Sequence, residues 1–233
     1  MKCTVIIPVL NPDNKLIGLV NEFLSNDIKD IIIVDDGSDK ENLSVYNNFD
    51  SCVKVYYHKK NKGKGAAIKT GISNLGDVDA FVTVDGDGQH RVKDVIKVIK
   101  SLQYSDVVFG SRNFKKKNVP LKSIIGNRFS SLIFFLTTFK KCRDTQTGLR
   151  AINIKYKDLA LSTKGDRYEY EMNFLYNIVK KTNIKFVNID TVYEDDNKGS
   201  HFKIFRDSFL VHKRFFIILI LLVVFIALIF VVC

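Results

Sequence analysis

Two carboxylates that directly follow an apolar segment are the residues of this sequence with the clearest chemical signal. Residues 80–84 are followed by Asp85, Gly86, Asp87 and Gly88. A short apolar segment rich in β-favouring residues predicts a buried strand, and ligands bind at the carboxyl ends of strands in open α/β sheets. The two carboxylates repel each other unless a cation lies beside them. Oxygen ligands next to glycines, where bulky groups can approach the backbone, suit Mg²⁺ or Mn²⁺ carrying a diphosphate.

Two other interpretations of this stretch have to be weighed. Asp-Gly pairs are common in ordinary turns, so the stretch alone does not establish a metal site. A calcium loop of the EF-hand type does not fit, because counting from Asp85 puts His90 at its required glycine and Ile96 at its closing glutamate. The metal–diphosphate interpretation therefore depends on the surrounding elements.

Other predicted strands also end in polar or charged residues. Residues 30–34 predict a strand that ends in two carboxylates. Residues 61–65, with Lys64 among them, place glycines and lysines before a predicted helix, which favours anion binding but lacks the P-loop spacing. Residues 106–110 predict a strand followed by Arg112. The predicted strands are residues 4–9, 30–34, 53–57, 80–84, 106–110, a segment reaching 153, and 185–189. Their alternation with helical segments predicts an α/β domain of three layers with a mostly parallel central sheet.

The composition restricts the class of partner. Lysine and arginine number 36 against 25 aspartate and glutamate residues, for a net charge of +11. This balance indicates a polyanionic partner, which could be a nucleotide substrate, an anionic membrane or nucleic acid. The four cysteines are scattered and show no zinc-binding spacing, so we expect reduced thiols.

The C-terminal residues predict a membrane anchor. Residues 215–232 carry no charged side chain, and basic residues precede them directly. This length is enough for a transmembrane helix, and the basic flank predicts a single-pass C-terminal anchor in the cell membrane with the main domain, residues 1–198, in the cytoplasm. Nothing at the start of the chain resembles a signal peptide. A nucleic-acid partner would explain the charge but not the anchor, so we expect none.

Two further segments could lie at the bilayer surface. Residues 199–214 form a basic juxtamembrane segment that includes Lys203 and Arg206, whose charges would lie near anionic lipid. Residues 121–139 have a helical pattern with an apolar end and flanking lysines. This pattern fits either a core helix or a helix lying in the membrane interface.

The order of these motifs resembles the family 2 glycosyltransferases with the GT-A (Rossmann-like) fold, of the kind that synthesises polyprenyl-phosphate (dolichyl-phosphate) sugars. The resemblance spans nearly the whole chain. The matching motifs are Val5-Ile-Ile-Pro8 with Asn11, Val34-Asp-Asp-Gly-Ser38, Asn61-Lys-Gly-Lys-Gly65, Asp85-Gly-Asp-Gly-Gln-His90, Gly110-Ser-Arg112, Asp144-Thr-Gln-Thr-Gly148, Tyr168-Glu-Tyr-Glu171, and Ser200-His201 with Arg206-Asp-Ser208.

The resemblance implies a role for each matching residue. The donor nucleotide would be bound by Pro8, Asn11, Asp36, Lys64 and Asp85. The divalent metal would be held by Asp85, Asp87 and Gln89. The acceptor phosphate would be bound by Arg112, Arg128, Lys203 and Arg206. The sugar and acceptor side would include Asp144 and Gln146. The residues expected to carry catalysis are Asp87, Arg112, Arg128, Asp144 and Arg206.

The sequence departs from the family pattern at two places. Asn11-Pro12-Asp13 replaces the usual aromatic-Asn-Glu sequence after the first proline, and Asn173 stands where an acidic residue often occurs. Both departures leave the nucleotide base and the sugar open. The sequence predicts one transmembrane helix, whereas some relatives have several, so any flippase function would belong to a partner membrane protein.

Together these features predict an inverting, metal-dependent transfer of one sugar from a nucleotide to a polyprenyl phosphate. A lipid phosphate is already an anion, so the reaction needs charge neutralisation rather than a strong base. The alternative acceptor is a hydroxyl of a glycan or glycolipid, for which Asp144 or Glu171 could act as the base. A non-catalytic membrane module that binds nucleotide sugars is a second alternative, and a sugar nucleotidyltransferase would need a phosphate loop after the first strand that this sequence lacks.

Overall fold

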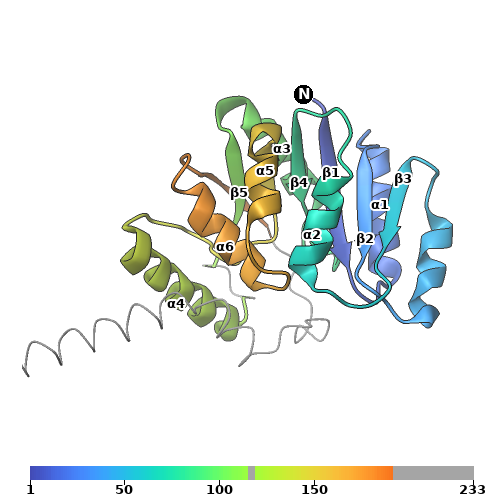
Figure 1. The fold of residues 1–233 in the computed structure, drawn as a ribbon, viewed down its shortest axis with the longest axis horizontal. Helices are drawn as coiled ribbons and strands as arrows, with labels where there is room; N and C mark the ends of the chain where they lie inside the picture. Colours follow the sequence, from blue (N-terminus) through green and yellow to red (C-terminus); the bar gives the residue numbers. More distant parts are fainter. Residues whose placement is uncertain (115–118, 191–233) are drawn as a thin grey trace, which may run out of the picture.

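The computed structural model describes residues 1–114 and 119–190, which form a seven-stranded sheet with helices on both faces (Figure 1). The order of the strands across the sheet is β3-β2-β1-β4-β6-β5-β7. The strands are β1 (Cys3–Val9), β2 (Ile31–Asp35), β3 (Val53–Tyr57), β4 (Ala80–Thr83), β5 (Val107–Arg112), β6 (Arg150–Asn153) and β7 (Lys185–Ile189). Strands β1 to β4 pair in parallel, as do β5 and β7, whereas β6 is antiparallel to both of its neighbours.

Alternation along the central strands explains why the sheet is covered on both faces. In β1, Val5 and Ile7 belong to one buried cluster and Ile6 to the other; in β2, Ile33 and Ile32 divide in the same way. Side chains alternate between the faces of a strand, so an uninterrupted apolar strand must be buried on both sides. The two clusters are therefore the two cores of a three-layer domain.

Helices from different parts of the chain cover the two faces. One face is covered by α1 (Asn14–Ser25) and α3 (Val92–Lys100), and the other by α2 (Lys64–Ser73), α5 (Lys157–Ser162) and α6 (Glu169–Ile178). Short 3₁₀ segments complete the described part: η1 (Lys40–Asn48), η2 (Ser101–Tyr104) and η3 (Ile154–Tyr156). Since β1, β2 and β4 run in the same direction, the residues after them, including Asp85, lie along one edge of the sheet.

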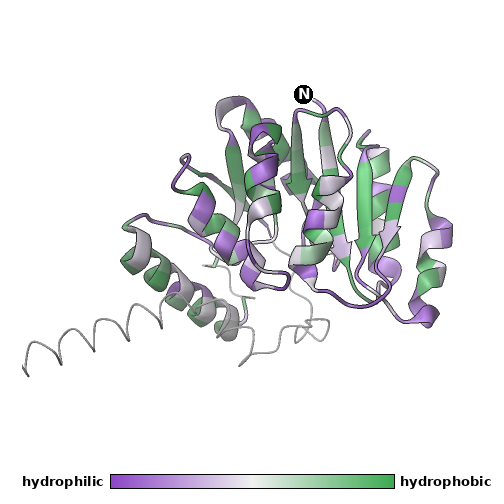
Figure 2. Cartoon of the chain, in the orientation of Figure 1, coloured by the Kyte–Doolittle hydropathy of each residue, from purple (hydrophilic) through white to green (hydrophobic). Residues whose placement is uncertain are grey.

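Helix α4 (Leu121–Thr138) lies at one end of the molecule beside α6 (Figure 1), and apolar residues recur along it (Figure 2). Its outer side carries large apolar side chains that are exposed. Its inner side contributes the fully buried Phe134 to the core. We call the outer side chains the apolar stripe; they are between 37% and 82% exposed. The apolar stripe consists of Leu121, Ile125, Phe129, Leu132, Phe135, Leu136 and Phe139.

The described structure confirms the predicted three-layer α/β domain, and its seven-stranded sheet is mixed, with four parallel and two antiparallel strand pairings. Residues 150–153 were expected to form a strand, but their antiparallel direction was not predicted, because a four-residue strand carries no signal for direction. The short helix α5 was also not expected. Within residues 1–114 and 119–190, no helix combines the length and apolarity that a membrane crossing needs. The predicted juxtamembrane segment and anchor, residues 199–232, lie outside the described residues.

Candidate active site

Asp85 is the centre of a largely buried cluster of charges that three elements bring together. It follows β4, and its Oδ1 atom lies 2.7 Å from Nζ of Lys64, the first residue of α2. The same ammonium lies 2.8 Å from Oε2 of Glu171, in the first turn of α6. Nε2 of His90 lies 3.7 Å from Oδ2 of Asp85. One lysine is therefore shared by two carboxylates.

The cluster shifts the pKa values of Asp85 and Lys64 in opposite directions. Burial opposes ionisation of Asp85, but attraction to Lys64 and contact with His90 outweigh it and hold the pKa of Asp85 below its ordinary value. Burial would lower the pKa of Lys64, but attraction to Asp85 and Glu171 raises it above the ordinary value. The attractions outweigh burial at both groups, so they favour an ammonium beside an ionised Asp85.

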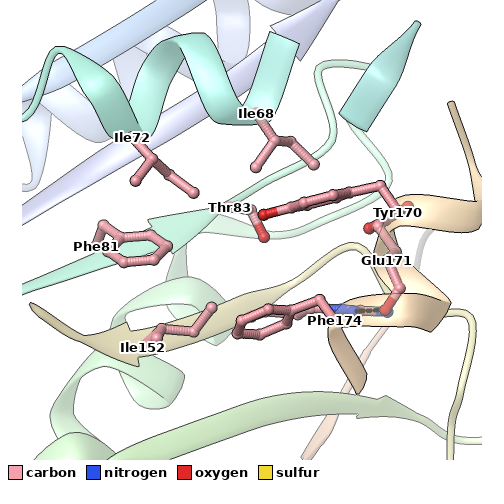
Figure 3. Close-up of a pocket in the computed structure, with 9 residues that line it drawn as sticks. Ile68, Ile72, Phe81, Thr83, Ile152, Tyr170, Glu171 and Phe174 are labelled. Atoms are coloured by element: carbon pink, nitrogen blue, oxygen red, sulfur yellow. Dashed lines mark hydrogen bonds between the residues drawn. The ribbon is translucent and has the colours of Figure 1, made fainter. Parts of the chain in front are cut away.

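Two buried polar atoms of the cluster are unsatisfied. Nδ1 of His90 and Oε1 of Glu171 have no hydrogen-bond partner among the described residues. Glu171 also borders a small cavity whose wall is otherwise mainly apolar (Figure 3). The cavity is lined by Ile68, Ile72, Phe81, Thr83, Arg150, Ile152, Tyr170, Glu171 and Phe174. Unsatisfied buried groups are costly, and they concentrate at sites that bind water or ligand.

The chain leaves no room between Asp85 and the segment that precedes β6. A Cβ atom placed on Gly148 would lie 2.2 Å from Oδ2 of Asp85, so only glycine fits there. Thr83, at the end of β4, donates a hydrogen bond of 2.8 Å to the carbonyl oxygen of Gly148. This close approach joins residues 144–148 to Asp85, the first carboxylate of the predicted metal-binding motif.

Asp87 and Gln89 extend the site toward solvent. Asp87 is exposed, and its Oδ1 accepts a hydrogen bond of 3.0 Å from the backbone N–H of Gln89. Partial desolvation and repulsion from Asp85 raise the pKa of Asp87. In residues 1–114 and 119–190, no set of three or more His, Cys, Asp and Glu side chains could enclose a metal by itself. The oxygen donors of Asp85, Asp87 and Gln89 fit a Mg²⁺ or Mn²⁺ that takes its other ligands from a diphosphate.

Arg112 and Asp144 form a bidentate ion pair at the other end of residues 144–148. Nε and Nη2 of Arg112 donate to the two carboxylate oxygens of Asp144 at 2.8 and 2.9 Å. The backbone N–H groups of Arg112 and Gln146 donate to the same carboxylate. Asp144 is fully buried. These four hydrogen bonds hold the buried carboxylate in place.

Residues 144–148 therefore begin at one ion pair and end at the other. Arg150 fixes their conformation, because its guanidinium donates to the carbonyl oxygens of Thr147 at 2.9 Å and Thr145 at 3.3 Å. It also donates to the carbonyl oxygen of Glu171 at 2.5 Å and lies over the Phe109 ring. A single buried arginine thus connects this segment to the α6 residue that binds Lys64.

Comparison with known proteins identifies the family of this chain. Residues 4–156 match the family model for glycosyl transferase family 2. The chain belongs to glycosyltransferase family 2. It is 34% identical over 215 residues to a UDP-N-acetylglucosamine–dolichyl-phosphate N-acetylglucosaminyltransferase of Methanococcus voltae, covering 82% of this chain and 86% of that protein. The family predicted from the sequence motifs is therefore confirmed, and the chain is a glycosyltransferase.

Solved structures of other glycosyltransferases share the fold. Mannosyl-3-phosphoglycerate synthase from Rubrobacter xylanophilus aligns with a TM-score of 0.73 and 14% identity, covering 91% of this chain and 72% of that one. Glucosyl-3-phosphoglycerate synthase from Mycobacterium tuberculosis, in complex with Mn²⁺, UDP-glucose and phosphoglyceric acid, aligns with a TM-score of 0.66 and 14% identity, covering 91% and 79%. These likenesses show the fold of the glycosyltransferase domain.

The residues expected at the donor nucleotide occupy different surroundings. Pro8 is half-buried near the end of β1. Asn11, with a positive φ of 52°, donates its backbone N–H to the Ser38 hydroxyl and exchanges hydrogen bonds with Asp39. These contacts join the turns after β1 and β2 on the glycosyltransferase domain.

Asp36 is turned into the protein rather than toward solvent. Its carboxylate accepts hydrogen bonds from the backbone N–H groups of Lys62 at 2.9 Å and Gly63 at 2.7 Å. It also lies 2.7 Å from Nδ1 of His58, whose Nε2 lies 2.9 Å from the hydroxyl of Thr70. Asp36 therefore shapes the loop that delivers Lys64, and its direct contact with nucleotide stays a prediction.

The structure describes only two of the four residues expected to bind the acceptor phosphate. Arg112 is largely buried beside Asp144, whereas Arg128 lies exposed on α4. Lys203 and Arg206 lie outside the described residues. Their roles toward the acceptor stay predictions.

Sequence reasoning missed Asn127 and Ser130 of α4, both buried. Oδ1 of Asn127 accepts from the backbone N–H of Thr145, and its Nδ2 donates to the carbonyl oxygen of Arg143 at 3.0 Å. Gln146 donates to the hydroxyl of Ser130 at 3.2 Å. Polar residues at helical spacing within an apolar helix were the available signal. They connect α4 directly to the segment that carries Asp144.

Proposed function

We propose that this glycosyltransferase transfers one sugar from a nucleotide sugar to the phosphate of a polyprenyl lipid such as dolichyl or undecaprenyl phosphate. The donor would be of the UDP-glucose or GDP-mannose type. The relative from Methanococcus voltae, which is named for a dolichyl-phosphate acceptor and aligns over most of both chains, supports this acceptor class.

The pairing of Asp144, Asp85 and Glu171 with cations is the observation that favours a phosphate acceptor. Asp144 is bound by Arg112, and Asp85 and Glu171 share Lys64. A hydroxyl acceptor needs a general base within hydrogen-bond reach. Asp144 and Glu171, the two candidates for that base, are each held by a cation. A lipid phosphate needs no base, because it is already ionised, so the arrangement favours it over a glycan hydroxyl.

The proposed reaction is a single displacement. An oxygen of the lipid phosphate attacks C1 of the sugar, and the bond from C1 to the diphosphate breaks, with its electron pair leaving on the diphosphate. The configuration at C1 inverts, and no proton has to be transferred. Asp85, Asp87 and Gln89 would hold Mg²⁺ or Mn²⁺, which neutralises charge on the leaving diphosphate when bound. Arg112, Arg128, Lys203 and Arg206 would bind the incoming phosphate, since guanidinium groups match its geometry.

A lipid acceptor also requires the protein to lie at a membrane. The apolar stripe of α4 is the described surface that suits an interfacial helix, because its apolar side chains are exposed together along one side. With residues 199–214 as a basic juxtamembrane segment and 215–232 as a single-pass anchor, the active site would face the cytoplasm at headgroup level. Transport of the product across the bilayer would then be carried out by a partner flippase.

The test is to identify the lipid product. The purified full-length protein in detergent is incubated with Mn²⁺ or Mg²⁺, a panel of labelled nucleotide sugars, and undecaprenyl or dolichyl phosphate. Matched reactions contain the corresponding polyprenol, which has a hydroxyl in place of the phosphate. We expect one sugar to be transferred to the phosphate lipid and none to the polyprenol. Transfer only to hydroxyl acceptors would contradict the proposal.

A further inference from the structure

The positive charge beside Asp85 is supplied by the chain itself. The Lys64 ammonium contacts Asp85 and Glu171 at 2.7 and 2.8 Å, and the three side chains are only 19%, 29% and 12% exposed, respectively. Asp85 is also one of the carboxylates expected to bind a divalent cation. A metal ion and Lys64 therefore require the same carboxylate.

The backbone around Lys64 cannot move far to resolve this conflict. A Cβ atom on Gly65 would lie 2.4 Å from the Cβ of Tyr170, and one on Gly71 would lie 2.4 Å from Cγ2 of Ile6. Helix α2 is thus packed directly against α6 and the sheet at both glycines. Any change of partner by Lys64 must come from its side chain, and lysine carries a compact charge on a flexible four-carbon stem.

We propose that Lys64 is an exchangeable counterion that neutralises Asp85 in the metal-free protein and turns to the donor diphosphate when metal and nucleotide bind together. This inference rests on the metal-dependent transfer proposed above. The metal replaces Lys64 at Asp85, and the diphosphate gives the released ammonium a new anion. Each ligand thus provides what the other's binding requires, which makes their binding mutually favourable.

Glu171 reduces the cost of this exchange. A lysine that leaves its only carboxylate would be a buried unpaired charge, which is strongly unfavourable. Because Lys64 also contacts Glu171, it keeps one anionic partner while it leaves Asp85. The carbonyl oxygen of Glu171 is held by Arg150, so this second partner stays in place. Glu171 is therefore a positioning residue for Lys64.

The test measures the binding of Mn²⁺ alone to the full-length protein in detergent, using the electron paramagnetic resonance signal of the free ion. In Lys64→Met, Asp85 is no longer occupied by an ammonium, so we expect Mn²⁺ to bind at least about fivefold more tightly, within the usual range of coupling between sites. With Mn²⁺ at a saturating concentration, we expect the same variant to bind UDP at least about fivefold more weakly, because the ammonium that would turn to the diphosphate is missing.

Lys69→Met is the matched control. Lys69 lies in the same helix, is 23% exposed, and contacts the carboxylate of Asp166 at 2.9 Å, away from Asp85. We expect its Mn²⁺ and UDP affinities to equal those of the parent. An equal change in both variants would mean that the loss of any lysine of α2 alters the site, and would overturn the specific role of Lys64.

The double variant Lys64→Met/Glu171→Gln separates competition from a change in total charge. It removes one positive and one negative charge, so the net charge of the cluster is unchanged while Asp85 is free. We expect its Mn²⁺ affinity to rise as in the single variant, and it provides the result if the single variant does not fold. Unchanged or weaker Mn²⁺ binding in the double variant would overturn the exchange. Absence of Mn²⁺ binding to the parent even with UDP present would instead overturn the proposed metal, and this inference with it.

Discussion

Arg112 binds Asp144 through two parallel hydrogen bonds, and this geometry depends on the guanidinium group. Lysine at position 112 would keep the positive charge but could not form both bonds at once. We expect Arg112→Lys to lower kcat at least tenfold, because loss of one donor at a site that stabilises charge typically costs about 10²–10³ in rate. The measurement is steady-state transfer to the lipid phosphate.

Arg91→Lys provides the comparison for this arginine. Nη1 of Arg91 lies 3.9 Å from Asp190, and its side chain is 46% exposed, so the pair is long and hydrated. We expect a near-parental kcat for this variant. A parental kcat for Arg112→Lys as well would show that the two parallel hydrogen bonds of the guanidinium are not required for transfer.

The exposed carboxylate of Asp87 permits a test of the metal that does not disturb the core. We expect Asp87→Ala to abolish transfer and to leave the melting temperature unchanged, since surface substitutions usually change stability by no more than about 0.5 kcal/mol. EDTA should inactivate the parent, and Mg²⁺ or Mn²⁺ should restore it. Asp77→Ala, at a fully exposed aspartate far from β4's carboxyl end, should retain full activity. Undiminished transfer in chelator would exclude the metal role.

At the scale of elements, α4 connects an outer surface to the active site through its inner side. Asn127 is 3% exposed and holds the backbone at Arg143 and Thr145, next to Asp144. Thr137, also on the inner side, instead donates 2.9 Å to the hydroxyl of Tyr176 in α6. The two contacts allow the hold on the active-site segment to be separated from general packing of the helix.

We therefore expect Asn127→Ala and Thr137→Val to differ in activity more than in stability. Asn127→Ala removes the hydrogen bonds to Arg143 and Thr145, and Thr137→Val removes the one to Tyr176, at a typical cost of about 0.5–1.5 kcal/mol for each bond. Only Asn127→Ala should raise the KM for the lipid phosphate and lower kcat, because only it releases the segment around Asp144. Melting temperatures and transfer kinetics of both variants provide the comparison. Equal kinetic losses would reduce Asn127 to a packing role.

The elements themselves were largely predictable, whereas their contacts were not. Apolar segments such as Ile31–Asp35 can only be strands buried on both faces, and the carboxylates after them had to lie at one edge. The pairing of Lys64 with Glu171, and of Asp36 with His58, joins residues from separate elements. No local pattern encodes such pairs, since they arise only when the sheet order and helix packing are fixed.

At the scale of the whole molecule, the direction of β5 determines where α4 lies relative to the chemistry. Arg112 ends β5, and α4 lies beyond this carboxyl end of the strand (Figure 1). Asp85 follows β4 at the same edge of the sheet. Tyr104, 75% exposed, precedes β5 and lies at its opposite end. If the apolar stripe contacts a bilayer, Arg112 and the residues around it lie near the lipid headgroups and Tyr104 stays in water.

The chain contains no tryptophan, so a single introduced indole reports this orientation without background. We expect Leu132→Trp, on the apolar stripe, to show blue-shifted emission and strong quenching by brominated lipids when the full-length protein is in anionic vesicles. An interfacial helix buries its apolar face about 5–10 Å into the headgroup and acyl boundary. Tyr104→Trp should instead be quenched by aqueous iodide and not by brominated lipids. Equal quenching of both indoles by iodide would mean that α4 faces water and that the acceptor reaches the crevice without contact between this helix and the membrane.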